Sequence, residues 1–307
     1  MRLWGVECAR LKRGRLNECA PSMSCSSLGS APIRQRGTRS LESARAATLE
    51  QMPRELLKRS VRKALQSSDW GRGILEARRE RLDADQRRRG IEFYRGFVNP
   101  GDLCFDIGAN VGNRTELLQE IGARVISVEP QGSCIDQLQR KFGDDEAVVI
   151  VPSAVGAEPG AAEIAVCEED STISTMSSRW QSEGRFSDRT WTRTESVPVT
   201  TMDQLIAEHG SPSFCKIDVE GFEKQVLEGL SSPVRCISFE FTREFLDDAR
   251  ACVGLLENLG PVVANASFGE SMDLSENWVD PNQIFSIVEA QPDDLDWGDI
   301  YVRSDGS

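Results

Sequence analysis

Histidine is almost absent from this chain, because His209 is the single one among 307 residues. It precedes Gly210 at the end of an expected helix, where an imidazole commonly interacts with the helix dipole or caps the terminus. A mechanism that depends on an imidazole base is therefore not expected. The chain also lacks any run of eighteen apolar residues, so we expect no transmembrane helix.

The nine cysteines are scattered, without paired CxxC spacing or a zinc-binding pattern. Cys104, Cys215 and Cys236 fall within apolar runs, where a free thiol behaves as a small hydrophobic side chain. Free thiols favour a reducing compartment, and we expect a cytoplasmic protein. Organellar targeting stays open, because residues 1–47 are rich in Arg and Ser and contain no Asp, as in a transit peptide. A start at Met23 or Met52 is the simpler alternative.

The charge divides the chain into two unlike parts. Residues 1–98 carry 22 Lys and Arg against 11 Asp and Glu, whereas residues 99–307 carry 14 against 38. A core this acidic repels nucleic acid, so a nucleic-acid substrate is not expected unless the basic leader carries the binding. Together with the patterning, the charge predicts a disordered basic leader (1–47), an N-terminal helical extension (48–98) and a catalytic domain (99–307). The extension is expected to hold helices at 53–66 and from Asp83 or Asp85 to Val98.

Residues 103–107 predict a buried strand that breaks at glycine and continues as a helix. The turn holds Gly108, Asn110 and Gly112, and Asp106 precedes it. A dinucleotide fingerprint needs a third glycine, which is missing, and Asp106 would repel phosphate. A carboxylate at this turn suits a ligand with an amino group instead.

A second acid, Glu129, follows the next expected strand, 23 positions after Asp106. At that distance in a βαβ unit an acidic side chain reaches a ribose diol. An ammonium group and a ribose without phosphate describe S-adenosylmethionine better than NAD.

Three blocks in this order resemble the class I S-adenosylmethionine-dependent methyltransferases, and more narrowly the FkbM-type family. They are Asp106-Ile107-Gly108-Ala109-Asn110-Val111-Gly112, Val128-Glu129-Pro130 and Lys216-Ile217-Asp218-Val219-Glu220-Gly221-Phe222-Glu223. The resemblance covers roughly residues 99–265. It implies that Asp106, Gly108, Asn110, Gly112 and Glu129 bind the cofactor, with Ser153 and Ala154 beside its adenine.

Strands and helices alternate along the domain, which predicts an α/β fold with a doubly wound, mostly parallel Rossmann-like sheet. We expect a β-rich or irregular insertion at 160–200, a last strand at 283–289 and a surface-exposed acidic tail at 293–299. The other strands are expected at 103–107, 124–128, 147–151, 213–218 and 234–241, and the helices at 111–121, 134–142, 202–209, 222–230 and 243–259.

Carboxylates are the candidates for chemistry at the carboxyl ends of these strands. Asp218 and Glu220 close one strand, and Glu240 closes the next. Lys216 shares a sheet face with Asp218, so it could keep that carboxylate ionised or face the acceptor itself. Asp218, Glu220 and Glu240 offer oxygen ligands of the kind that Mg²⁺ prefers, but nothing in their spacing demands a metal and none is expected.

We interpret the sequence as that of an O-methyltransferase. The resemblance implies that it methylates hydroxyl groups of sugars, polyketides or similar small-molecule or glycan acceptors. Two alternatives remain, a nucleotide-dependent oxidoreductase on a similar sheet and a non-catalytic scaffold that binds the cofactor. Nothing in the sequence indicates the acceptor or an oligomeric state.

The leader generates a testable prediction. Its composition cannot bury enough apolar surface to order itself, so deletion of residues 1–47 should change the melting temperature by no more than about 4 °C, which is about 1 kcal/mol. Differential scanning fluorimetry of both forms measures this. A larger loss would show that the leader packs on the domain.

Overall fold

The computed structural model describes residues 69–166, 174–183, 191, 193–293 and 295–304. The chain divides into two compact units, Met1–Arg72 and Gly73–Ser307. Of the first unit only residues 69–72 are described, at the start of helix α3 (Asp69–Tyr94). The predicted helix at 53–66 lies outside the described residues. No described helix is both long enough and apolar enough to cross a membrane.

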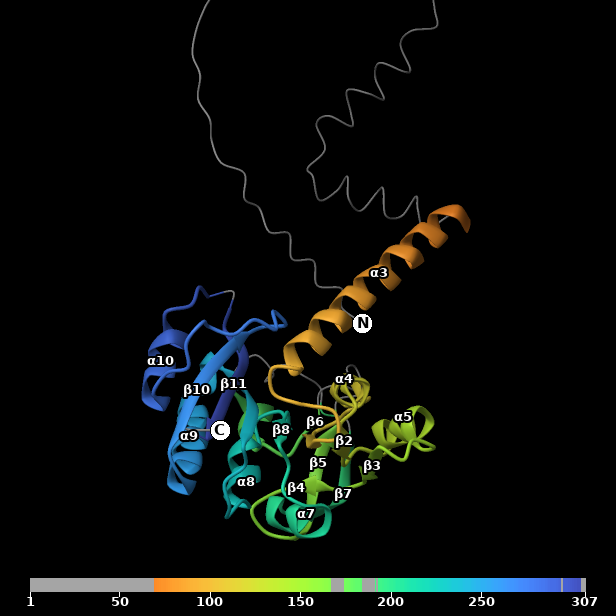
Figure 1. Ribbon diagram of the computed structural model, residues 1–307. Coiled ribbons are helices and arrows are strands. Elements are labelled where there is room, and N and C mark those ends of the chain that lie inside the picture. Colours follow the sequence, from red (N-terminus) through yellow and green to blue (C-terminus); the bar gives the residue numbers. More distant parts are fainter. Residues whose placement is uncertain (1–68, 167–173, 184–190, 192, 294, 305–307) are drawn as a thin grey trace, which may run out of the picture. The chain divides into compact units, whose positions relative to one another are not determined.

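A seven-stranded sheet is the main element of the second unit, with the strand order β10-β11-β9-β8-β1-β2-β3. Figure 1 labels β10, β11, β8, β2 and β3 of this sheet. Strands β9, β8, β1, β2 and β3 are parallel to one another, and β11 runs antiparallel between β9 and β10. The predicted mostly parallel Rossmann-like sheet is confirmed. The strands are β1 (Leu103–Ile107), β2 (Arg124–Val128), β3 (Val148–Val151), β8 (Phe214–Ile217), β9 (Cys236–Thr242), β10 (Val262–Phe268) and β11 (Trp297–Ser304).

Side chains of each central strand alternate between the two faces of the sheet. In β1, Phe105 and Ile107 belong to one hydrophobic core and Cys104 belongs to the other. In β8, Cys215 and Phe214 are separated in the same way. Because both faces are buried, these strands read as short apolar runs in the sequence, which is why they were predictable.

Helices cover both faces of the sheet. The end of α3 packs with α4 and α5 in one core, and α7, α8, α9 and α10 pack in the other. A 3₁₀ turn, η2 (Arg243–Phe245), precedes α9, so the predicted helix at 243–259 is divided in two. The helices are α4 (Asn113–Ile121), α5 (Gly132–Phe142), α7 (Met202–His209), α8 (Glu223–Glu228), α9 (Leu246–Leu259) and α10 (Pro281–Glu289).

The insertion, predicted at 160–200 as β-rich or irregular, contributes β5, β6 and β7 to a second sheet, which β4 completes in the order β4-β7-β5-β6. Its longest strands, β5 (Gly160–Val166) and β7 (Arg193–Thr200), are antiparallel along their length. A small core of Ala154, Ile164, Val166 and Val197 holds it together. The remaining elements are β4 (Ala154–Val155), β6 (Ser174–Thr175) and the short helix α6 (Ser178–Ser182).

The prediction of a last strand at 283–289 is wrong, because this segment lies in helix α10. Asp280 caps the helix by accepting a hydrogen bond from the Asn282 amide at 3.0 Å, and Pro281 occupies the first turn, where its missing N–H costs nothing. Ile284 and Val288, four residues apart, then share the buried helix face. The last two strands are β10 and β11, which the sequence analysis missed.

The prediction of a surface-exposed acidic tail at 293–299 is also wrong at its end. Asp293 is fully exposed as expected, but Asp299 lies within β11. Its carboxylate is 2.8 Å from the ammonium of Lys216, and only 14% of its side chain is exposed. Asp299 is buried because it forms an ion pair with Lys216 of β8, which is far away in the sequence.

Two glycines with left-handed backbone differ in the space around them. Gly108 lies where the ends of β1 and β8 meet, whereas Gly122 ends α4. A Cβ at Gly108 (φ 82°) would lie 1.8 Å from the Asp218 carbonyl oxygen, whereas at Gly122 (φ 96°) the nearest atom is a Pro100 side-chain carbon at 3.2 Å. Gly122→Ala should cost about 1–2 kcal/mol from the left-handed backbone alone. Gly108→Ala adds a backbone clash and should cost at least about twice as much.

Urea unfolding of the two variants and the wild type measures the difference. Equal losses of unfolding free energy would show that the contact between Gly108 and Asp218 is not the constraint.

Candidate functional site

The turn between β1 and α4 folds over the end of β2. Gly108, Asn110 and Gly112 have positive φ angles of 82°, 50° and 82°. The amides of Gly108 and Ala109 both donate to the Val128 carbonyl, at 2.9 and 3.0 Å. Asparagine is among the few other residues that tolerate this conformation. The turn therefore presents backbone rather than side chains at the carboxyl edge of the sheet.

Glu129 lies under this turn, directly after β2. Its carboxylate accepts hydrogen bonds from the amides of Asn110 at 2.9 Å and Gln131 at 2.8 Å, one on each oxygen. The residue is only 6% exposed. Burial raises the pKa of Glu129 to about 7, although the two amides oppose the shift. Each oxygen keeps a further lone pair, so the carboxylate can still accept two hydroxyl groups.

Asp106 is buried deeper than expected for a ligand at the surface of the turn. It is 1% exposed, and its carboxylate accepts a hydrogen bond from the Thr115 hydroxyl at 2.6 Å. Thr115 also lies 2.7 Å from the Ser127 hydroxyl. Burial raises the pKa of Asp106 against the effect of the Thr115 hydrogen bond. A direct contact of Asp106 with an amino group stays a prediction.

Ser153 and Ala154 follow β3, at the same edge of the sheet. The Ser153 hydroxyl is within hydrogen-bond distance of two backbone carbonyls, those of Ala154 at 2.9 Å and Pro198 at 3.0 Å. Its single proton is therefore already used within the protein. The role of these two residues beside adenine also stays a prediction.

Three carboxylates meet where β8 and β9 end. Asp218, Glu220 and Glu240 are partly buried, and each has an oxygen within 4.8 Å of the others. Burial raises the pKa of Glu240 well above its ordinary value, and the negative charges of Asp218 and Glu220 raise it further. Oxygens at this spacing could hold a divalent cation. The sequence-based expectation of no metal therefore stays a prediction.

Lys216 is a buried cation beside this acidic cluster, on the same strand as Asp218. Its ammonium lies 3.2 Å from an oxygen of Asp218 and 2.8 Å from an oxygen of Asp299. Burial opposes the charge of Lys216, but the two carboxylates outweigh it and hold its pKa well above the ordinary value. The amine is therefore a lasting positive charge between Asp218 and Asp299.

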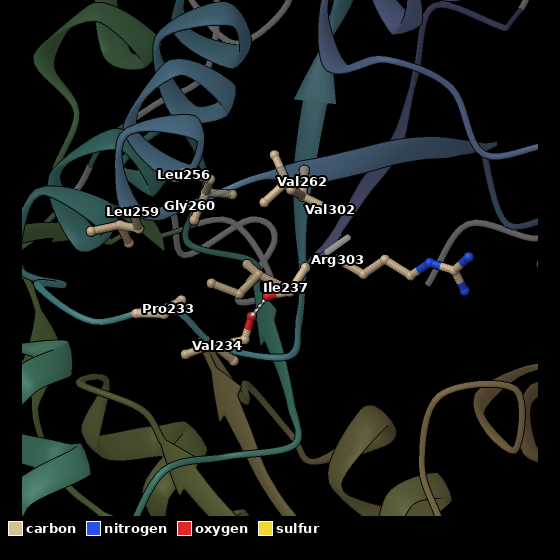
Figure 2. Close-up of a pocket in the computed structure, with 10 residues that line it drawn as sticks. Pro233, Val234, Ile237, Leu256, Leu259, Gly260, Val262, Val302 and Arg303 are labelled. Carbon is tan, nitrogen blue, oxygen red and sulfur yellow. Dashed lines mark hydrogen bonds between the residues drawn. The ribbon is translucent and has the colours of Figure 1, made fainter. Parts of the chain in front are cut away.

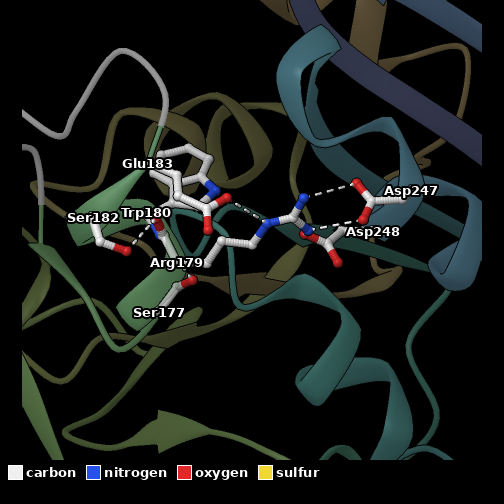
Figure 3. Close-up of polar contacts among 7 residues, drawn as sticks. All are labelled: Ser177, Arg179, Trp180, Ser182, Glu183, Asp247 and Asp248. Atoms are coloured by element: carbon white, nitrogen blue, oxygen red, sulfur yellow. Dashed lines mark hydrogen bonds and ion pairs between the residues drawn. The ribbon is translucent and has the colours of Figure 1, made fainter.

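The insertion contacts the start of α9 through α6, as Figure 3 shows. The Arg179 guanidinium binds Asp247 at 2.9 Å and Asp248 at 2.8 Å, at the start of α9. Trp180 stacks on Phe245, with the ring centroids 6.0 Å apart. A small cavity between α6 and α9 is lined by Trp180, Phe245 and Glu240, among others. Helix α6 is thus fixed next to the acidic cluster.

His209 lies at the opposite edge of the sheet. It ends α7, and Ser213, four residues later, donates to the Leu103 carbonyl at the start of β1. Its position at the helix terminus agrees with the sequence-based interpretation. The described part of the site therefore contains carboxylates and a lysine, and this histidine is not among them.

A second cavity lies at the amino end of β9 and does not belong to the site (Figure 2). Its lining is mainly apolar, the Arg303 side chain extends away from it, and the Ser304 hydroxyl donates to the Val234 carbonyl at 3.3 Å. Ligand sites in such sheets lie at the carboxyl ends of the strands. This cavity is better explained as a packing gap between α9 and the sheet.

The sequence analysis did not identify Thr115, Asp299 or Glu223 as parts of the site. Thr115 and Asp299 are placed by pairing with Asp106 and Lys216, which no local pattern shows. Glu223 was visible only as the last residue of the block 216–223. Its carboxylate accepts backbone amides of the preceding loop.

Among solved structures, the chain is similar to several methyltransferases at low identity. The precorrin-6y C5,15-methyltransferase of Geobacter metallireducens is 12% identical, with 71% of this chain and 86% of that chain covered and a TM-score of 0.35. The S-adenosyl-L-methionine-bound fibrillarin of Aeropyrum pernix is 11% identical, with 67% and 68% covered and a TM-score of 0.39. Scores this low carry no argument about activity.

A further neighbour is the SAM-dependent O-methyltransferase of Thermotoga maritima, which is 13% identical, with 72% of this chain and 64% of that chain covered and a TM-score of 0.34. No curated protein matches the sequence. Residues 106–260, which include the turn, Glu129 and the acidic cluster, match the family described as the methyltransferase FkbM domain. This match covers just over half of the 307 residues, and the chain therefore belongs to the FkbM methyltransferase family.

Proposed function

We propose that this protein methylates a hydroxyl group on a small-molecule or glycan acceptor, such as a sugar or polyketide. S-adenosylmethionine is the cofactor of this methyltransferase. The observation that carries the proposal is the acidic cluster of Asp218, Glu220 and Glu240 at the carboxyl edge of the sheet that also holds the glycine turn. Hydroxyl acceptors need a proton acceptor during transfer, and a carboxylate next to the methyl donor supplies one.

The turn and Glu129 would hold the cofactor. Glu129, whose position is fixed by the amides of Asn110 and Gln131, would accept the ribose hydroxyls. The backbone of residues 108–112, with Asp106 beneath it, would contact the methionine part, and Ser153 and Ala154 would lie beside the adenine.

Methyl transfer is an in-line displacement in which the acceptor oxygen attacks the methyl carbon and the bond from carbon to sulfur breaks. The cofactor brings most of the reactivity, so the protein positions the two reactants and takes up the proton. Asp218 receives the hydroxyl proton. The Lys216 ammonium, 3.2 Å from an Asp218 oxygen, places a positive charge beside the acidic cluster and holds the Asp218 side chain in place.

The alternatives make different predictions in a binding screen. An oxidoreductase is disfavoured by family membership and by the missing third glycine, and it would be stabilised by NAD. A non-catalytic scaffold would bind S-adenosylmethionine without transferring its methyl group. We infer a cytoplasmic enzyme, because its described cysteines are free thiols. Residues 99–307 carry 38 acidic against 14 basic side chains, which disfavours a nucleic-acid acceptor unless the basic leader carries the binding. Fluorimetry with S-adenosylmethionine, S-adenosylhomocysteine and NAD, followed by an acceptor panel, separates these functions.

The pKa of Glu129 predicts a pH dependence of cofactor binding. The ribose hydroxyls would donate to the ionised carboxylate, so Glu129 must lose its proton before the ligand binds. With a pKa of about 7, the affinity for S-adenosylhomocysteine should be nearly constant above about pH 8 and about tenfold weaker at pH 6. Calorimetry across this range measures the dissociation constant.

Two variants of Glu129 provide the controls. Glu129→Ala should weaken binding at least tenfold at pH 8, because it removes charged hydrogen bonds of about 1.5–3 kcal/mol each. Glu129→Gln should also bind weakly, but without the change between pH 6 and 8. If the wild type shows no pH dependence and Glu129→Ala binds normally, Glu129 does not contact the ribose.

If Asp218 is the proton acceptor, its substitution should lower the turnover number without changing the affinity for the cofactor. Asp218→Asn keeps the shape of the side chain but removes the basic oxygen, so the turnover number should fall about 10²–10⁴-fold. The dissociation constant for S-adenosylhomocysteine should stay within about twofold, because Asp218 does not bind the cofactor. Glu220→Gln is the matched control in the same loop and should have the smaller effect.

A chelator distinguishes a metal-dependent mechanism. We expect EDTA to leave the wild-type turnover unchanged. A loss with EDTA that Mg²⁺ restores would assign Asp218, Glu220 and Glu240 to a divalent cation. Near-normal turnover of Asp218→Asn, with and without EDTA, would contradict a carboxylate base.

A further inference from the structure

The loop between β8 and α8 has an unusual backbone. Glu220 has a φ of 54° and Gly221 a φ of 88°. Glycine adopts this left-handed region freely, but glutamate rarely does. The Glu220 carboxylate also lies within 4.8 Å of two others of the same charge. Backbone preference and charge repulsion both act against this placement of Glu220, so other contacts must hold it.

Glu223 holds the loop from the side of α8. One oxygen of its carboxylate accepts hydrogen bonds from the amides of Val219 and Gly221, each at 3.2 Å. These are the two residues that flank Glu220. Glu223 is buried, with 8% exposed, so water competes little for these bonds. A single carboxylate oxygen therefore fixes the backbone on both sides of Glu220.

The second sheet holds the same loop from the other side. The Thr175 hydroxyl, on β6, donates to the Glu220 carbonyl at 2.6 Å, and the Ser177 amide donates to the Thr175 hydroxyl at 2.8 Å. Thr175 is 1% exposed. The indole of Trp180 occupies the position of a side chain at Gly221, where a Cβ would lie 2.2 Å from the ring. The loop cannot move toward α6 without displacing Trp180.

We propose that Glu223 and Thr175 are positioning residues for the acceptor site, which hold the Glu220 carboxylate beside Asp218 and Glu240. The inference rests on the proposed function and deepens it, because it joins the second sheet to the acidic cluster. Neither residue acts as an acid or a base. Glu223 works as a hydrogen-bond acceptor and Thr175 as a donor, and both act through the backbone of Glu220.

Three variants test this. Glu223→Ala and Thr175→Val remove the two contacts, and Glu223→Gln keeps an oxygen that accepts the same amides. The matched controls are Glu228→Ala, which breaks only an exposed pair with Lys224 on the same helix, and Thr200→Val, at the end of β7. For each variant we would measure the melting temperature, the dissociation constant for S-adenosylhomocysteine, the exchange of the Val219 and Gly221 amides, and kcat and KM with an acceptor from the panel.

Glu223→Ala should lower kcat about 10–100-fold, because release of the Val219 and Gly221 amides lets the loop that carries both Asp218 and Glu220 shift, and a shift of about 1 Å at the reacting centre costs this much. Its Val219 and Gly221 amides should exchange faster, and cofactor affinity should stay within about twofold. Thr175→Val should also lower kcat without loss of cofactor affinity. Glu223→Gln should restore kcat to within about threefold of the wild type, and both controls should behave as the wild type does. If Glu223→Ala does not fold, Thr175→Val carries the test alone.

Wild-type kcat in Glu223→Ala and Thr175→Val would overturn the inference. So would a failure of Glu223→Gln to restore kcat, which would show that the charge matters. A parallel loss of stability, cofactor affinity and kcat would show that both residues only stabilise the fold, and it would also overturn the inference. These results differ from absence of methyl transfer by the wild type, which contradicts the proposed function itself and with it this inference.

Discussion

The contact on which this site depends is between two pieces of backbone, at the ends of β1 and β8. The amide of Asp218 donates to the Ile107 carbonyl at 2.9 Å, and Gly108 leaves no room for any side chain against the Asp218 carbonyl. The first strand end begins the glycine turn (Gly108–Gly112), and the second begins the loop that carries Asp218 and Glu220. Because they touch here, the glycine turn and the carboxylates share one edge of the sheet.

Sequence reasoning recovered the parallel part of the fold because those strands are buried on both faces. Strands β1 and β2 and helix α7 were predicted with the bounds that the structure has. The carboxyl-terminal part was not recovered. The apolar residues of 281–289 suit either a strand or a helix, and the decision for a helix comes from Asp280 and Pro281 at its start. Strand β11 contains Asp299 and Arg303, so it does not read as an interior strand.

The candidate site was predictable to the extent that strand order brings residues together. Asp218 and Glu240 close neighbouring strands, so their proximity follows from the topology. The partners of the buried groups could not be predicted. Asp299 meets Lys216 across 83 positions, and Thr175 meets Glu220 across 45. Such contacts depend on how separate elements pack, and no local pattern in a single sequence indicates them.

The fit of Trp180 against Gly221 has a consequence for how this chain can change. The indole and the missing side chain occupy one volume, although one belongs to the insertion and the other to the loop after β8. A segment of different sequence grafted between β4 and β7 would leave a hole over the loop or collide with it, unless the loop changed at the same time. The insertion and the loop after β8 therefore form one packed unit, and a replacement of the insertion requires a matching change in that loop.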